Sequence, residues 1–129
     1  MEEVKKQGVE SLFCPYEQAL ALKELGFDEP CVYVYLDKDT IRQNHGFMNY
    51  PKEIYSGVIK TPLYQQAFRW FREKYNLNSF IIDSKSYNWY FNINDMIKDD
   101  VVSEVLYFKT YEEVELACLD KLIEIAKKQ

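Results

Sequence analysis

Histidine chemistry in this chain rests on one residue, because His45 is its single histidine. Any serine-histidine or cysteine-histidine mechanism would have to use it. His45 lies in the polar stretch Gln-Asn-His-Gly-Phe, where a solvated side chain is the simpler interpretation. Cys14 stands near a predicted helix start, where the helix dipole can lower the pKa of a thiol, but packing in an apolar cluster explains it more simply. We therefore expect no catalytic residue and no enzyme.

Two polar stretches have some features of a cation site. Asp37-Lys-Asp39 begins as a calcium loop does, but Arg42 stands where such a loop requires glycine. The second stretch comprises Asn92, Asn94, Asp95, Asp99 and Asp100. These oxygens could surround a cation, although a solvated turn explains the same residues. The four glycines supply no phosphate-binding loop, so we expect neither a metal nor a cofactor.

The number and spacing of the cysteines, together with the N-terminal segment, bear on the cellular compartment. They are three in number, at spacings that match no zinc motif, and in a reducing compartment we expect them to be free thiols. They are Cys14, Cys31 and Cys118. The segment Met1–Glu10 has little apolar content and no cleavage pattern of the secretory kind. A cytoplasmic location is therefore expected.

Composition indicates a globular protein. With 129 residues, of which 47% are apolar and 29% charged, the chain can bury a core without disulfide or metal staples. No apolar run approaches the roughly 20 residues that cross a bilayer, so we expect no membrane partner. The net charge of −5 disfavours nucleic acid backbones, because binding them requires Lys and Arg to neutralise phosphates. An acidic surface could instead face a basic protein patch.

The first half of the chain predicts a helix over 15–25. Pro15 suits the first helical position, and Gly26 suits the left-handed position just beyond the last turn. This placement makes Leu22 and Phe27 the apolar pair of a Schellman ending.

A strand follows over 31–36, and its composition suggests a central or well-covered strand. Its alternation would place Val32, Val34 and Leu36 on one face, opposite Tyr33 and Tyr35. Residues 37–60 then read as a long loop, within which Glu53 to Ile59 could form a short strand. A loop of this length is functional, mobile or contains an element that the pattern does not reveal.

The second half begins with a predicted helix over 61–75. Thr61 would be its N-cap and Pro62 its first helical residue, and Asn76 or Asn78 could end it. The buried face of this helix would contain Leu63, Ala67, Phe68, Phe71 and Tyr75.

Two apolar runs, 80–82 and 87–93, predict a hairpin, and residues 101–108 suggest a further strand. The last helix would begin at Thr110, which with Glu113 forms a capping box. Together the elements predict an α+β fold, in which about three helices pack on a mostly antiparallel sheet of three to five strands. We expect a flexible segment over 1–10 and a single domain over 11–129.

Aromatic side chains are the main candidates for a binding surface. The chain has 11 Tyr, 8 Phe and 2 Trp, more than small sheets and helices easily bury, and Tyr and Trp are enriched where proteins contact partners. On the second helix Tyr64 and Trp70 fall outside the centre of the apolar face, and two arginines flank Trp70. The candidate partner-binding residues are Tyr64, Arg69, Trp70, Arg72, Trp89 and Tyr90.

Three runs of the sequence, Pro15–Phe27, Pro62–Tyr75 and Phe108–Ile123, resemble a family of small uncharacterised proteins. Members of that family are encoded by phages, prophages and mobile elements, especially those of gut Bacteroidetes. The resemblance covers most of the chain apart from its first ten residues and the 37–60 loop. It implies an accessory role, such as binding a host factor, a small signalling molecule or another phage protein.

Two classes of function remain. The first is a non-catalytic phage or mobile-element accessory protein that binds a host or phage protein, with an anti-defence role among the options. The alternative is a small ligand-binding or nucleotide-binding protein, or an enzyme, that uses the 37–60 loop with His45, Tyr50 and Tyr55. Self-association through an apolar face of the last helix is compatible with either.

Overall fold

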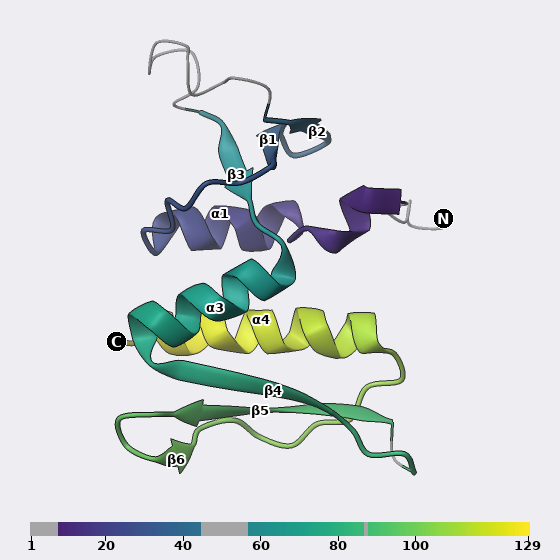
Figure 1. Ribbon diagram of the computed structural model, residues 1–129, viewed down its shortest axis with the longest axis vertical. Coiled ribbons are helices and arrows are strands. Elements are labelled where there is room, and N and C mark those ends of the chain that lie inside the picture. The colour runs from purple at the N-terminus through teal and green to yellow at the C-terminus, as the bar shows by residue number, and fades with distance from the viewer. Residues whose placement is uncertain (1–7, 45–56, 87) are drawn as a thin grey trace. The chain divides into compact units, whose positions relative to one another are not determined.

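The computed structural model describes residues 8–44, 57–86 and 88–129. The chain divides into two compact units, Met1–Tyr64 and Gln65–Gln129 (Figure 1). Each unit contains a three-stranded antiparallel sheet. The α+β class is therefore confirmed, with two small sheets in place of the single sheet expected. One domain over residues 11–129 stays a prediction.

In its described residues, the first unit is a small sheet with one α-helix against it. Its elements are the 3-10 helix η1 (Gly8–Leu12), α1 (Tyr16–Glu24), β1 (Tyr33–Asp37), β2 (Thr40–Gln43) and β3 (Ile59–Thr61). The strand order is β2-β1-β3, so β1 is central, as its β-branched and aromatic residues predict. Helix α1 packs against β3, and Ala19, Tyr35 and Ile59 form a buried cluster between helix and sheet.

The end of α1 confirms the Schellman motif. Gly26 has φ +100°, in the left-handed region that favours glycine. The N–H of Phe27 donates to the carbonyl of Leu22 at 2.9 Å, and the N–H of Gly26 donates to that of Lys23 at 3.0 Å. These two hydrogen bonds satisfy carbonyls that the end of the helix would otherwise leave without partners.

Of the three interpretations of residues 37–60, the one with an element that the pattern does not reveal is confirmed, because β2 lies within this stretch and β3 begins at Ile59. The pattern hid β2, since three of its four residues are polar and the strand acquires its conformation by pairing with β1. The expectation that the strand over 31–36 is well covered holds at Val34, which is 1% exposed, but not at its ends, where Val32 is 62% exposed and Leu36 is 41% exposed. Val32 lies before β1 begins, and Leu36 lies at a register shift between β1 and β2. His45, Tyr50, Tyr55 and most of the predicted 53–59 strand lie outside the described residues.

Thr61 does not cap the second helix. It is the last residue of β3, fully buried, and its hydroxyl donates to the carbonyl of Cys14 at 2.6 Å. Helix α3 begins later and spans Tyr64–Tyr75. Asn76, with φ +58°, follows its last residue, as one of the two predicted endings requires.

The second unit continues with a hairpin and a long helix. Its elements after α3 are β4 (Leu77–Asp83), β5 (Trp89–Asp95), β6 (Asp100–Val101) and α4 (Tyr111–Lys127), with strand order β4-β5-β6. The predicted hairpin is confirmed by antiparallel pairing from Leu77 with Asp95 to Asp83 with Trp89. Helix α4 runs along β4 and β5 and packs on both (Figure 1).

The predicted start of α4 is confirmed. The Thr110 side chain accepts a hydrogen bond from the N–H of Glu113 at 3.1 Å, as an N-cap residue should. The apolar stripe faces the core, with six residues buried: Val114, Cys118, Leu119, Leu122, Ile123 and Ala126. Burial of each large aliphatic side chain stabilises the unit by about 1.5–3 kcal/mol.

Candidate functional site

The two aromatic candidates on α3 are buried. Tyr64 is 8% exposed and Trp70 is 7% exposed, so the expectation that they lie on the surface is wrong. The Trp70 ring contacts the rings of Phe71 and Tyr75, with centroids at 5.2 and 5.5 Å. The ammonium of Lys74 lies 5.2 Å from the centre of the Trp70 ring. Side-chain packing, which helix periodicity alone does not reveal, covers this indole.

The arginines of α3 are exposed. The Nε of Arg69 lies 2.8 Å from a carboxylate oxygen of Glu73, one helical turn further on. A solvated pair of this kind contributes about 0.3–0.5 kcal/mol to a helix. Arg72 is exposed as well. With Trp70 buried, the two arginines flank no exposed aromatic anchor among the described residues of α3.

The second pair of candidates divides between the two faces of the β4-β5 sheet. Trp89 lies on the inner face, where its ring meets Tyr111 of α4 at a centroid distance of 5.2 Å. Phe91 and Ile93 share that face and are buried. Tyr90 points to the opposite face, and its ring meets that of Tyr107 at 5.6 Å.

We call the side of β4 and β5 opposite α4 the outer face. Its members on the two strands alternate with the buried residues, and register places Asn78 beside Asn94, Phe80 beside Asn92, and Ile82 beside Tyr90. None of these six side chains is fully buried. Phe80 is 45% exposed, and Tyr107, which joins the outer face through Tyr90, is 53% exposed.

One buried polar atom also lies on the outer face. The side-chain oxygen of Asn94 is buried and finds no hydrogen-bond partner among the described residues. Such an acceptor costs about 1–3 kcal/mol relative to a paired one.

The outer face was only partly predictable. The sequence singled out Tyr90 but not Phe80, Ile82 or Tyr107. Alternation along 77–83 gives the face of Phe80, and the hairpin register then joins it to Tyr90. Tyr107 had no such signal, since the predicted strand over 101–108 is regular only at β6.

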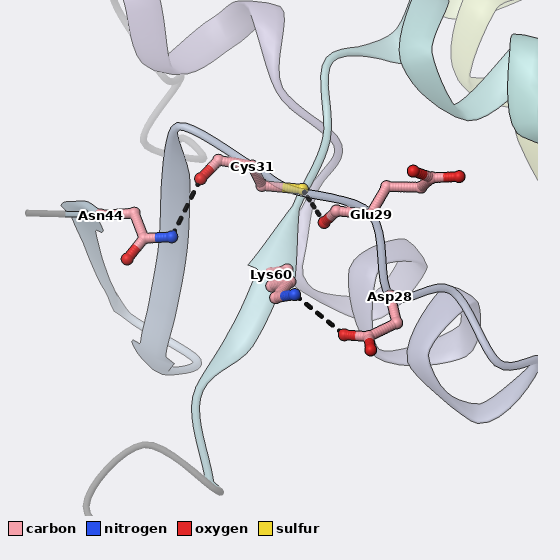
Figure 2. Close-up of polar contacts among 5 residues, drawn as sticks. All are labelled: Asp28, Glu29, Cys31, Asn44 and Lys60. Carbon is pink, nitrogen blue, oxygen red and sulfur yellow. Dashed lines mark hydrogen bonds and ion pairs between the residues drawn. The ribbon is translucent and has the colours of Figure 1, made fainter. Parts of the chain in front are cut away.

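The first unit contains a hollow of about 350 Å³ lined by Pro30, Cys31, Val32, Gln43 and Asn44. Figure 2 shows how Asn44 is held beside it: the side-chain Nδ2 donates to the carbonyl of Cys31 at 3.0 Å. The N–H of Asn44 donates to the carbonyl of Val32 at 2.6 Å. The side-chain oxygen of Asn44 is buried, and no described residue donates to it.

Cys31 beside that hollow is not a reactive thiolate. Burial raises the pKa of its thiol to about 12, with Glu29 and Asp28 adding to the rise and Lys60 opposing it. The Lys60 ammonium is engaged by Asp28, at 2.8 Å from its carboxylate (Figure 2). The thiol donates weakly to the carbonyl of Glu29 at 3.5 Å. A protonated thiol is a poor nucleophile and a poor metal ligand.

The other residues considered for catalysis or metal binding are explained by packing and by turn geometry. All three cysteines are buried free thiols, as predicted. Asp95 closes the turn after β5, where one carboxylate oxygen accepts from the N–H groups of Ile97 and Lys98 at 3.0 and 3.1 Å. Within the described residues, no three His, Cys, Asp or Glu side chains are grouped so as to hold a metal ion.

Comparison of the chain with family models, curated proteins and solved structures finds no match. The resemblance to proteins of phages and mobile elements therefore stays a prediction. In the part of the chain that the structure describes, no helix has the length and apolar character that a membrane span requires.

Proposed function

We propose that this chain is a non-catalytic accessory protein of a phage or mobile element, and that it binds a host or phage protein through the outer face. The observation that carries the proposal is the alignment of Phe80, Ile82, Tyr90 and Tyr107 on one side of the sheet, with Phe80 and Tyr107 about half exposed.

The composition of this face suits protein recognition. Aromatic rings supply a large contact area with few rotatable bonds, and they are enriched at the centres of protein interfaces. The three asparagines on the same face, Asn78, Asn92 and Asn94, can each donate and accept hydrogen bonds. Truncating an aromatic residue at the centre of such an interface typically costs about 2 kcal/mol or more of binding free energy.

The accessory role is supported by the sequence resemblance, which covers Pro15–Phe27, Pro62–Tyr75 and Phe108–Ile123. An accessory protein of this kind would bind a host factor or another phage protein, and interference with host defence is one such role. The buried thiols of Cys31 and Cys118, each with its pKa raised to about 12 by burial, favour binding over covalent catalysis.

Photo-crosslinking in the native cells tests the proposal. A benzophenone amino acid would replace Phe80 or Tyr107 on the outer face, and Arg72 on α3 would be the matched control. We expect one discrete protein adduct from the first two positions, with its partner identified by mass spectrometry, and none from position 72. An adduct from position 72 alone would move the interface to α3 and overturn the proposal.

Small-molecule binding in the Cys31 hollow is a second candidate, favoured by the volume of the hollow, about 350 Å³, which Cys31 and Asn44 help to line. Native mass spectrometry of the purified chain would detect a retained small molecule. We expect Asn44→Ala to lose it and Asn92→Ala, on the outer face, to keep it; equal retention by both variants would exclude this site.

A further inference from the structure

A groove of about 270 Å³ lies in the second unit between residues 104–108 and α4. Its apolar lining consists of Phe91, Leu106, Phe108 and Ala117. The rings of Phe91 and Phe108 are stacked, with centroids 6.3 Å apart and planes at 23°. A side chain with an aliphatic stem would therefore find an apolar surface there.

The path of the chain along β5 explains the groove. Val102 donates to the carbonyl of Ile93 at 2.8 Å, and Phe108 exchanges two backbone hydrogen bonds with Trp89 at 2.7 and 2.8 Å. Between these hydrogen bonds, the five residues 103–107 lie opposite only three residues of β5, 90–92. The longer segment therefore bulges away from the strand. The Ser103 hydroxyl, accepting from the N–H of Ile93 at 2.8 Å, replaces a backbone partner where the bulge begins.

Charged side chains surround the groove. Glu104, Asp120 and Glu124 supply three carboxylates, and Lys121 supplies one ammonium. Lys121 lies 3.2 Å from Glu124, and hydrogen bonds and charge from Lys121 and Lys128 lower the pKa of Glu124 below its usual value. Glu124 therefore stays ionised at neutral pH. The lining residues carry a net charge of −2, three carboxylates less one ammonium, and Lys128, 3.4 Å from Glu124, reduces the local balance to −1.

We propose that this groove binds an arginine or lysine side chain of the partner protein, an inference that rests on the function proposed above. The apolar lining accepts the stem of the basic side chain, and the carboxylates accept its charged end. The segment that bounds the groove also joins the outer face, since Leu106 lines the groove and Tyr107 contacts Tyr90. One partner can thus place an apolar surface on the outer face and a basic residue in the groove.

Titration with two small probes tests the groove without knowledge of the partner. The probes are n-hexylguanidinium and the uncharged n-hexylurea, of the same shape, followed by backbone amide NMR of the full chain. We expect n-hexylguanidinium to bind at least about fivefold more tightly and to shift the amides of Leu106, Ala117 and Asp120; the preference should fall in about 0.5 M salt. Equal affinity for both probes, or shifts confined to other residues, would overturn the proposal.

Two matched variants separate the groove charge from the general charge of α4. Glu104→Gln combined with Asp120→Asn should reduce the preference for the guanidinium probe to less than about twofold. Glu112→Gln combined with Glu113→Gln also removes two negative charges, from the part of α4 outside the groove. Glutamine suits the capping-box position 113 as glutamate does, so the helix start should be retained. This variant should leave the preference for the guanidinium probe unchanged. An equal loss in both variants would show general attraction and contradict the groove site.

The result is independent of the crosslinking experiment. Selective guanidinium binding with no crosslink from positions 80 and 107 would refute the outer face as an interface and leave the groove site standing. Crosslinks from those positions without guanidinium selectivity would refute the groove site alone.

Discussion

Trp89 and Tyr90 are neighbours in the chain and lie on opposite faces of the second sheet. The Trp89 ring meets Tyr111 of α4 at 5.2 Å, and the Tyr90 ring meets Tyr107 on the outer face at 5.6 Å. The same alternation buries Phe91 and Ile93 beside Trp89. The first residue is therefore part of the core and the second part of a surface.

Substitution should separate these two roles. Trp89→Leu removes a half-buried ring from the core, and we expect it to lower the free energy of unfolding by about 2–3 kcal/mol. Tyr90→Thr keeps a residue suited to strands and should cost about 1 kcal/mol, mainly the ring contact with Tyr107. Urea unfolding followed by circular dichroism measures both. Equal losses would mean that the outer face is packed as tightly as the inner one.

The backbone carbonyl of Cys14 accepts hydrogen bonds from two residues of the first unit that are distant in the sequence. It accepts from the Thr61 hydroxyl at 2.6 Å and from the Tyr35 hydroxyl at 3.3 Å. We expect Thr61→Val, which keeps the shape but removes the donor, to destabilise the chain by about 1–2 kcal/mol. Thr61→Ser keeps the donor and is the control in the same chemical unfolding assay. If Val were tolerated as well as Ser, the hydroxyl would contribute no net stability.

Gly26 should resist substitution because its φ of +100° is strained for any residue with a Cβ. Gly26→Ala is expected to lower the unfolding free energy by about 1–2 kcal/mol. Glu24→Ala, at an exposed position within α1, should change it by less than about 0.5 kcal/mol. Thermal unfolding of the two variants compares them directly, and a Gly26→Ala variant as stable as the wild type would contradict the Schellman ending.

Glu115 should give the chain a pH-dependent stability. Burial raises its pKa from 4.5 to about 7, with the Glu112 carboxylate adding to the rise. Since the folded pKa is the higher one, this group's contribution is complete below about pH 4.5 and is lost as pH rises through 7. We expect Glu115→Gln to gain stability relative to the wild type between about pH 5 and pH 8. Unfolding curves at several pH values test this, and a constant difference between the two proteins would exclude it.

Local sequence signals predicted much of the secondary structure. The ending of α1 depends on residues 22–27, and the start of α4 depends on Thr110 and Glu113, so a few neighbouring residues were sufficient. The hairpin was equally accessible, because alternation over each strand sets its inner face.

Features that depend on distant residues were not predictable in this way. Thr61 looked like a helix cap because Pro62 follows it, yet its hydroxyl bonds to Cys14, 47 positions away. Strand β2 has little apolar character and depends on β1 for its ladder. The angular position of Trp70 on the helix predicted an exposed ring, but packed side chains cover it. The prediction of partner-binding residues was limited by the same dependence on distant residues. Of the six residues chosen from the sequence, only Tyr90 lies on the outer face.

Amide hydrogen exchange of the chain with and without its crosslinked partner protein tests the central claim most directly. We expect new protection in residues 78–82, 90–94 and 104–108, the segments that form the outer face and bound the groove. Protection confined to residues 69–72 of α3, or to the first unit, would contradict binding through the outer face.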